Sequence, residues 1–184
     1  MLYLCKWLLT LMTDKKENIL QAALELFATN GYNAVSTSKI AKEAKVSEGL
    51  IFRHFQNKKG LVDAILDQAY ERAAQLYSHI ILEENPKKAI HKAIVLPFQV
   101  NESEYHFWKL LFKLKWELEI SGQEKMQPLT EKLAWAFGEL NYPEPFKEAQ
   151  VLQHIIESIS GGIIKDGLET QVPLRDFLLE KYKV

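Results

Sequence analysis

Glycine, proline and cysteine are scarce in this 184-residue chain, which contains 8 glycines, 6 prolines and one cysteine. A β protein rich in turns needs many turn residues, so the scarcity of glycine and proline favours long helices. Because Cys5 is the only cysteine, the chain can form neither an internal disulfide nor a cysteine-based zinc site. The composition fits a reducing cytoplasm, and we expect no metal and no cofactor.

The chain also lacks an apolar run that could cross a bilayer, which takes about 20 residues. Its first eleven residues, MLYLCKWLLTL, are apolar but have neither the basic start nor the small-residue cleavage site of a signal peptide. The simpler interpretation is that the native chain begins at Met12 and that residues 1–11 are a gene-model extension. The alternative is an accessory helix that packs on the body or touches a membrane surface.

Positive charge is not in excess over the whole chain, whose net charge is −1. Its distribution is uneven, however. Residues 12–60 contain 8 Lys and Arg against 5 Asp and Glu, a net charge of +3, whereas 14 basic residues face 19 acidic ones from Leu61 onward, a net charge of −5. A basic head on an acidic body is the pattern expected if only the head meets phosphate groups.

Apolar residues recur at helical spacing through almost the whole chain, and no segment has the pattern of a strand. In the first predicted helix, Ile19, Ala23 and Phe27 are four residues apart, Thr13 or Asp14 can cap the start, and Asn30-Gly31 ends it. Ser36 or Thr37, then Ser47 and Asn57, are candidate caps for the next three helices. The sequence thus predicts an all-α fold with helices over residues 14–30, 36–44, 47–55, 58–82, 87–100, 102–120, 124–141, 145–168 and 173–182.

Residues 36–61, STSKIAKEAKVSEGLIFRHFQNKKGL, have the pattern of a helix-turn-helix. Ala41 and Ala44 are small enough to let two short helices cross, and Val46 supplies an apolar anchor in the turn between them. Ser47 begins a second helix whose N-terminal end would be free to enter the major groove of DNA. The pattern therefore predicts a DNA-binding head.

This stretch resembles the TetR (TetR/AcrR) family of transcriptional regulators. The matching positions are Thr37, Ile40-Ala41, Val46-Ser47, Phe52-Arg53-His54-Phe55 and Lys58, with Ala22-Ala23, Leu26-Phe27 and Gly31-Tyr32 upstream. The resemblance implies a three-helix DNA-binding domain over residues 12–60 and a helical-bundle domain for ligand binding and dimerisation over 61–184. It further implies a cytoplasmic, nucleoid-associated homodimer that binds palindromic double-stranded operator DNA, represses transcription and is released by a small apolar or aromatic ligand.

Two positions depart from the family pattern. Lys45 occupies a turn position where glycine is usual, so a positive φ there would cost about 1 kcal/mol. Phe52 stands where tyrosine is common, and it cannot donate a hydroxyl to phosphate. Phe52 must therefore act by packing or by touching a thymine methyl group.

The resemblance and the helix geometry together imply a set of DNA contacts: Thr37, Ser38, Ser47, Glu48, Gly49, Leu50, Phe52, Arg53, His54 and Lys58. Thr37 and Ser38 would meet phosphate at a helix N-terminus, and His54 and Lys58 would also contact the backbone. Several of these positions have a structural alternative. Leu50 and Phe55 have the spacing of core residues, Glu48 can simply complement a helix dipole, and His54 can be a buried, hydrogen-bonded side chain.

The resemblance also implies two further sites, both in the body. Aromatic residues expected to line an effector pocket are Phe98, Tyr105, Trp108, Phe112, Trp116 and Trp135, with an ordinary core as the alternative. Ile155, Ile159 and Ile163 are the expected dimer contacts. Gly161-Gly162 is costly inside a helix and is explained by close helix approach at a two-fold interface or by a local break beside the pocket.

No motif in the chain favours an enzyme. Di-iron sites in helical bundles need paired Glu-x-x-His motifs, and none of the five histidines is preceded by glutamate at that distance. The HExxH, P-loop and G-x-S-x-G motifs are also missing, so we predict no catalytic residues. The remaining alternative to a DNA-binding regulator is a helical adaptor that binds proteins and uses the helix-turn-helix only as a structural element.

Overall fold

The computed structural model describes the backbone of residues 2–120 and 123–184 and the side chains of residues 15–120 and 124–184. Within these ranges the chain is helical and contains no strand, which confirms the predicted all-α class. The helices are α1 (Leu2–Asn30), α2 (Thr37–Glu43), α3 (Glu48–Phe55), α4 (Lys58–Ile81), α5 (Pro86–Val95), η1 (Leu96–Gln99), α6 (Glu102–Glu117), α7 (Gln123–Glu139), α8 (Pro145–Asp166), η2 (Leu168–Gln171) and α9 (Val172–Tyr182).

Most helix ends agree with the sequence signals. Asn57 accepts a hydrogen bond from the Gly60 amide at 2.9 Å, as expected of the residue before α4. The start of α1 differs, since this helix begins at Leu2 and Thr13 and Asp14 lie inside it rather than capping it. The predicted helix over 87–100 is also shorter, because α5 gives way to a 3-10 turn that contains Pro97, whose missing N–H cannot continue an α-helix.

The chain forms two compact units. The first consists of Met1–Tyr70 with Leu110–Ile120, and the second of Glu71–Lys109 with Ser121–Val184. The division differs from the boundary expected at residue 60, because part of α4 and the second half of α6 belong to the first unit. Leu110, Leu111 and Leu114 of α6 are buried, which gives this segment an apolar side to pack.

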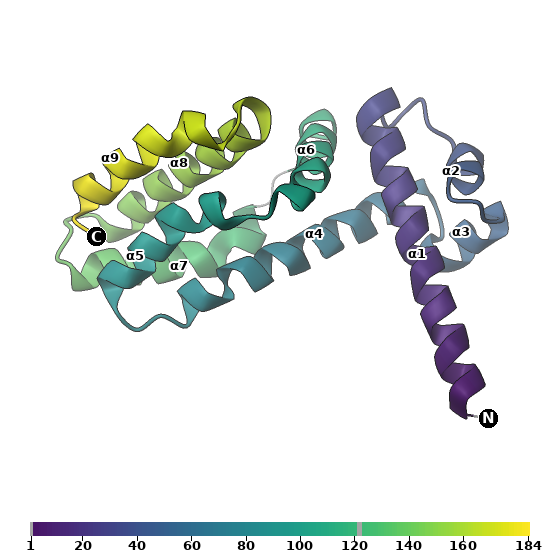
Figure 1. Cartoon of the computed structure of the whole chain (residues 1–184), viewed down its shortest axis with the longest axis horizontal. Helices are drawn as coiled ribbons and strands as arrows, with labels where there is room; N and C mark the ends of the chain where they lie inside the picture. Colours follow the sequence, from purple (N-terminus) through teal and green to yellow (C-terminus); the bar gives the residue numbers. More distant parts are fainter. Residues whose placement is uncertain (1, 121–122) are drawn as a thin grey trace. The chain divides into compact units, whose positions relative to one another are not determined.

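In the first unit, α2 lies beside the C-terminal half of α1 and α3 follows it (Figure 1). The predicted apolar stripe of α1 is the centre of this unit, since Ile19, Ala23 and Phe27 are completely buried. Buried residues from the neighbouring helices include Ile40, Ile51, Phe55, Leu61 and Ile65. Each of the short helices α2 and α3 therefore buries one side and leaves the other to solvent.

The second unit is a helical bundle. Helices α7 and α8 pack along each other, and α5 packs against α7 and α9 (Figure 1). Its core contains residues from all four helices, among them Ile90, Leu133, Phe137, Leu152 and Leu178. Tyr182 at the end of α9 donates a hydrogen bond to Glu148 of α8 at 2.8 Å, which ties the C-terminal helix to the bundle.

Candidate nucleic-acid interface

The turn between α2 and α3 is closed by backbone hydrogen bonds. The Val46 amide donates to the carbonyl of Ala41 at 2.9 Å, and the Lys45 amide donates to that of Lys42 at 3.3 Å. This pairing is a Schellman motif, which requires a left-handed residue directly after the C-cap. Lys45 occupies that position with φ of 55°, so the lysine carries the backbone strain expected from its departure from glycine.

Lys45→Gly is expected to raise the free energy of unfolding by about 1 kcal/mol, because glycine adopts this conformation without a Cβ clash. Urea denaturation followed by circular dichroism measures the change. Lys45→Ala is the matched control, since it removes the same charge but keeps a Cβ at positive φ. An equal gain in the alanine variant would show that charge, and not backbone strain, is the cause.

Two of the predicted contact residues bind each other. The Thr37 hydroxyl of α2 donates to the Glu48 carboxylate of α3 at 2.6 Å, and both side chains are partly buried. The bond joins the two helices of the helix-turn-helix. It also occupies the Thr37 proton that was expected to face phosphate. Ser36 is the side-chain cap of α2, accepting from the Lys39 amide at 3.2 Å, whereas Ser47 precedes α3 without a side-chain cap bond.

The outward side of α3 is formed by Gly49, Phe52 and Arg53, all exposed. These residues are three and four positions apart and therefore lie on one side of the helix. Phe52 is 48% exposed, so the first of its two alternatives, packing within the chain, does not explain it. Ile51 and Phe55 are buried on the opposite side and Leu50 is half-buried, which places Phe55 in the core as the alternative interpretation held.

Gly49 is unexplained by the protein's own packing. A Cβ built at this position has no heavy atom within 4 Å, apart from its immediate surroundings in the helix, and its φ is not positive. Neither a close contact within the chain nor the backbone conformation therefore requires glycine. Gly49 therefore leaves open space on the side that α3 exposes.

Three cations near this surface have no hydrogen-bond or ion-pair partner among the described residues: Lys42, Lys45 and Arg53. The other nearby lysines are occupied. Lys59 forms an ion pair with Asp63 at 2.8 Å, which raises the pKa of this exposed lysine, and Lys39 donates to Asn30 at 3.2 Å. These three cations lie on α2, on the turn and on α3 respectively.

Lys58 is engaged inside the protein. Its ammonium donates to the carbonyls of Tyr32 and Val35 at 2.7 and 2.9 Å and lies 4.1 Å from the centre of the Tyr32 ring. These contacts use two of the three ammonium protons to hold the loop between α1 and α2 against the start of α4, so that only one proton is left for the predicted phosphate contact. The same loop is held by Glu117 of α6, which accepts from the Tyr32 amide at 2.7 Å. Nothing in the local sequence pattern indicates this long-range pair.

The junction between α3 and α4 is tightly constrained. Gln56 has φ of 64° and ψ of −44°, and the Asn57 amide donates to the carbonyl of Phe55 at 2.7 Å, which is the geometry of a γ-turn. A Cβ on Gly60 would lie 2.0 Å from the Phe55 carbonyl oxygen. Glycine at position 60 therefore lets α4 approach the end of α3. The sequence pattern around Gly60 does not indicate this close approach to the Phe55 carbonyl.

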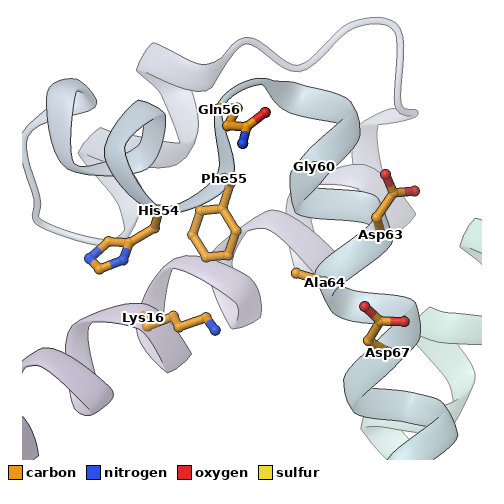
Figure 2. A pocket seen from close by; sticks show the side chains of 8 residues that line it. All are labelled: Lys16, His54, Phe55, Gln56, Gly60, Asp63, Ala64 and Asp67. Atoms are coloured by element: carbon orange, nitrogen blue, oxygen red, sulfur yellow. The ribbon is translucent and has the colours of Figure 1, made fainter.

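His54 faces the interior side of the first unit. Its Nε2 atom is buried and has no hydrogen-bond partner among the described residues. The side chain borders a hollow of about 290 Å³, where Phe55 lies between His54 and the acidic residues Asp63 and Asp67 of α4 (Figure 2). The buried Nε2 atom cannot reach phosphate, so a contact of His54 with the DNA backbone would have to use Nδ1. The alternative prediction was a buried, hydrogen-bonded histidine. The Nε2 atom is buried as that prediction requires, but it forms no hydrogen bond with the described residues.

The six aromatic candidates for an effector site differ in exposure. Phe98, Tyr105, Trp108 and Phe112 are half-buried, whereas Trp116 is 88% exposed and Trp135 is 36% exposed. The last two therefore do not line an enclosed site within this chain, because their rings face solvent. The Tyr105 hydroxyl and the Trp108 indole nitrogen are both buried without a partner among the described residues.

The predicted dimer contacts on α8 are largely wrong. Ile159 and Ile163 are 0% and 3% exposed and belong to the core of the second unit, while Ile155 is half-buried and packs against that core. Their helical spacing was correct, but it marks the inward side of α8. The exposed apolar residues of the two C-terminal helices are Phe146, Val151, Leu174 and Phe177.

Gly161 and Gly162 lie inside an unbroken α8, which rules out a local break in this helix. A Cβ on Gly162 would come within 2.6 Å of the Gln171 side chain. A Cβ on Gly161 would meet nothing within 4 Å. Packing within the chain therefore explains glycine at position 162 but not at position 161.

No helix in the described ranges is both long and apolar enough to span a membrane. No group of three His, Cys, Asp or Glu side chains in the same ranges is placed to hold a metal ion.

Comparison with known proteins finds regulatory proteins among the similar chains. The chain is 49% identical over 57 residues to the uncharacterized HTH-type transcriptional regulator YvkB of Bacillus subtilis, a match that spans 31% of this chain and only 30% of that protein. It is 29% identical over 160 residues to the fatty acid metabolism regulator protein of the same organism, covering 86% and 75% of the two chains. The crystal structure of NalD, the secondary repressor of the MexAB-OprM multidrug efflux pump in Pseudomonas aeruginosa, has a similar fold, with a TM-score of 0.67, 21% identity, and coverage of 93% and 96%.

The two-unit helical architecture and the exposed second helix of the turn define a helix-turn-helix protein. Residues 19–65 match the family model described as bacterial regulatory proteins, tetR family. Over this segment the chain is similar to the TetR family, as the sequence motif indicated.

Proposed function

We propose that this protein is a homodimeric repressor of transcription that binds palindromic operator DNA through α3 and leaves it when a small apolar molecule binds the second unit. The observation that carries the proposal is the outward side of α3. This side combines an exposed phenylalanine, an arginine with no partner among the described residues, and a glycine that the protein's own packing does not require. The names of the relatives describe transcriptional regulators, which supports regulation over catalysis.

The proposed contacts divide into two groups. Arg53 has the geometry to reach guanine or phosphate, Phe52 to touch a thymine methyl group, and Gly49 to admit the DNA closely. Ser38 and Ser47 are exposed and can donate hydroxyl protons to phosphate. Thr37 and Glu48 instead support the site by fixing α2 against α3.

The proposed dimer uses the exposed sides of α8 and α9. Phe146 and Val151 of α8, together with Leu174 and Phe177 of α9, are apolar and 38–58% exposed. Gly161 lies on α8 with open space around it. A two-fold axis through these helices would form a four-helix bundle and bury the apolar side chains of both protomers. The two α3 helices would then face successive major grooves, about 34–36 Å apart or a multiple of that.

Release from DNA is proposed as a shift between two populations of the dimer. A ligand that binds better to the form with the wrong spacing between recognition helices lowers operator affinity by its differential affinity for the two forms. Half-buried aromatic residues of the second unit suit an apolar ligand. The relative named as a fatty acid metabolism regulator is consistent with a ligand of this kind.

Operator binding tests the proposal. An operator selected from random DNA is titrated at two salt concentrations, and the affinity is expected to fall steeply as salt increases because counterions are released. Arg53→Ala should weaken binding about tenfold or more and reduce the salt dependence, with folding and dimerisation unchanged. Lys88→Ala, which removes an exposed cation of the second unit, is the control and should bind normally. A protein that selects no palindrome would instead be a helical adaptor.

A further inference from the structure

We propose that the effector is an apolar carboxylic acid, and that the Tyr105 hydroxyl and the Trp108 indole N–H bind its carboxylate oxygens. This inference rests on the proposed ligand-dependent release and names the chemistry of the ligand. It starts from two polar atoms on α6 that are buried without a hydrogen-bond partner among the described residues.

Buried donors without partners are rare in folded proteins, because each loses its hydrogen bonds to water and gains nothing in exchange. Here two of them occur three residues apart on one helix. Residues at this spacing lie on the same side of a helix with their Cβ atoms about 5–6 Å apart. Two donors on the same side of one helix are placed to approach a single acceptor group, such as the two oxygens of a carboxylate.

The donor chemistry restricts the ligand to a hydrogen-bond acceptor. An indole N–H can only donate, and a neutral phenol donates its one proton. Burial raises the pKa of the Tyr105 hydroxyl, with a smaller contribution from Glu102, so that the group keeps its proton. A ligand that ends in an ammonium group would leave the Trp108 donor unpaired and is therefore disfavoured.

The surroundings of these donors are apolar. Tyr105 packs against the core of the second unit, as do Leu76, Tyr77 and Phe98. The Trp108 ring meets the Phe107 ring edge-on at 5.2 Å. A ligand that reaches the two donors therefore needs an apolar body to match these neighbours.

A positive charge near the same aromatic pair favours an anion over a neutral acceptor. The Arg72 guanidinium lies 4.2 Å from the centre of the Phe107 ring, and it has no carboxylate partner among the described residues. Because a guanidinium attracts a carboxylate in a region of low dielectric, Arg72 should add affinity for the ionised acid. The opposing charge is that of Glu102, which is exposed and therefore better screened.

The experiment is calorimetric titration of the full-length protein with octanoate, dodecanoate and hexadecanoate, each below its micellar concentration. Methyl dodecanoate and dodecylammonium are the matched neutral and cationic probes. At least one carboxylate should bind. Methyl dodecanoate and dodecylammonium should bind at least about tenfold more weakly than dodecanoate. Failure of every carboxylate to bind would overturn the inference, and an ester that binds equally well would overturn the assignment of an anion.

Variants separate recognition from folding. Tyr105→Phe and Trp108→Phe should each lower carboxylate affinity about tenfold, yet leave the unliganded protein equally stable or raise its melting temperature, because each removes an unpaired buried polar atom. Tyr142→Phe and Trp135→Phe, in the same unit, are the controls, and both should leave the carboxylate affinity unchanged. A loss of stability that parallels the loss of affinity would indicate a merely structural role and overturn the assignment of these two donors.

Operator binding without ligand is measured on the same preparations. A protein that binds its operator but no carboxylate would sink this inference and leave the proposed DNA binding intact. A protein that binds a carboxylate through Tyr105 and Trp108 but no operator would sink the proposed regulatory function instead.

Discussion

Phe177→Glu is expected to convert the dimer into a monomer at micromolar concentration. Phe177 is 58% exposed on α9 and would lie on the two-fold interface, so that each dimer receives two buried charges. Loss of an aromatic anchor costs about 2 kcal/mol or more at each of two symmetric positions, which corresponds to an increase of about a thousandfold in the dimer dissociation constant. Analytical ultracentrifugation measures this change directly.

The same variant should lose most of its operator affinity, because a monomer engages only one half-site and forfeits the effective concentration that the dimer provides. Leu82→Glu is the matched control. Leu82 is 79% exposed but lies beyond the end of α4 and belongs to neither α8 nor α9, so this variant should remain dimeric. A Phe177→Glu protein that stays dimeric would remove the α8–α9 surface from the proposed interface.

Gly49→Leu is expected to stabilise the folded protein while it weakens operator binding. The new side chain meets open space in the free protein, and leucine has a higher helix propensity than glycine by up to about 1 kcal/mol. In the complex it would occupy the space needed for DNA. Overpacking of about 1 kcal/mol or more at each of two half-sites lowers the affinity about thirtyfold or more. Thermal unfolding and fluorescence anisotropy with labelled operator give the two quantities.

Gly138→Leu provides the matched control for this prediction. Gly138 lies exposed on α7 of the second unit, and a Cβ there also meets nothing within 4 Å. The substitution should leave operator affinity unchanged. If Gly49→Leu bound operator as well as the native protein, the outward side of α3 would not be the side that meets DNA.

The helix-turn-helix was predictable because its determinants are local. Short-range signals such as Ser36 before α2 and Asn57 before α4 act within a single turn of helix, and the structure confirms both. The strain at Lys45 was predictable for the same reason, since a Schellman motif needs a left-handed residue at one known position. The inward residues Ile51 and Phe55 followed from their spacing.

The less successful assignments concerned residues whose neighbours in the fold are far away in the sequence. Periodicity showed that α8 has an apolar side, but not that its own bundle covers Ile159 and Ile163 while Phe146 and Val151 remain exposed. Lys58 appeared free to meet phosphate until the fold brought two loop carbonyls to its ammonium. Aromatic content likewise gave no means of separating the exposed Trp116 from the half-buried Trp108.

The sequence by itself determined the helical class, the positions of most helix ends, and a basic helix-turn-helix at the head of an acidic body. These properties depend on residues within a few positions of one another, or on composition. Only the tertiary structure decided which apolar residues stay exposed, which polar atoms are buried without partners, and which charged groups are already bound. Such properties depend on residues far apart in the chain, as when Glu117 reaches the Tyr32 amide, and they arise only when packing brings those residues together.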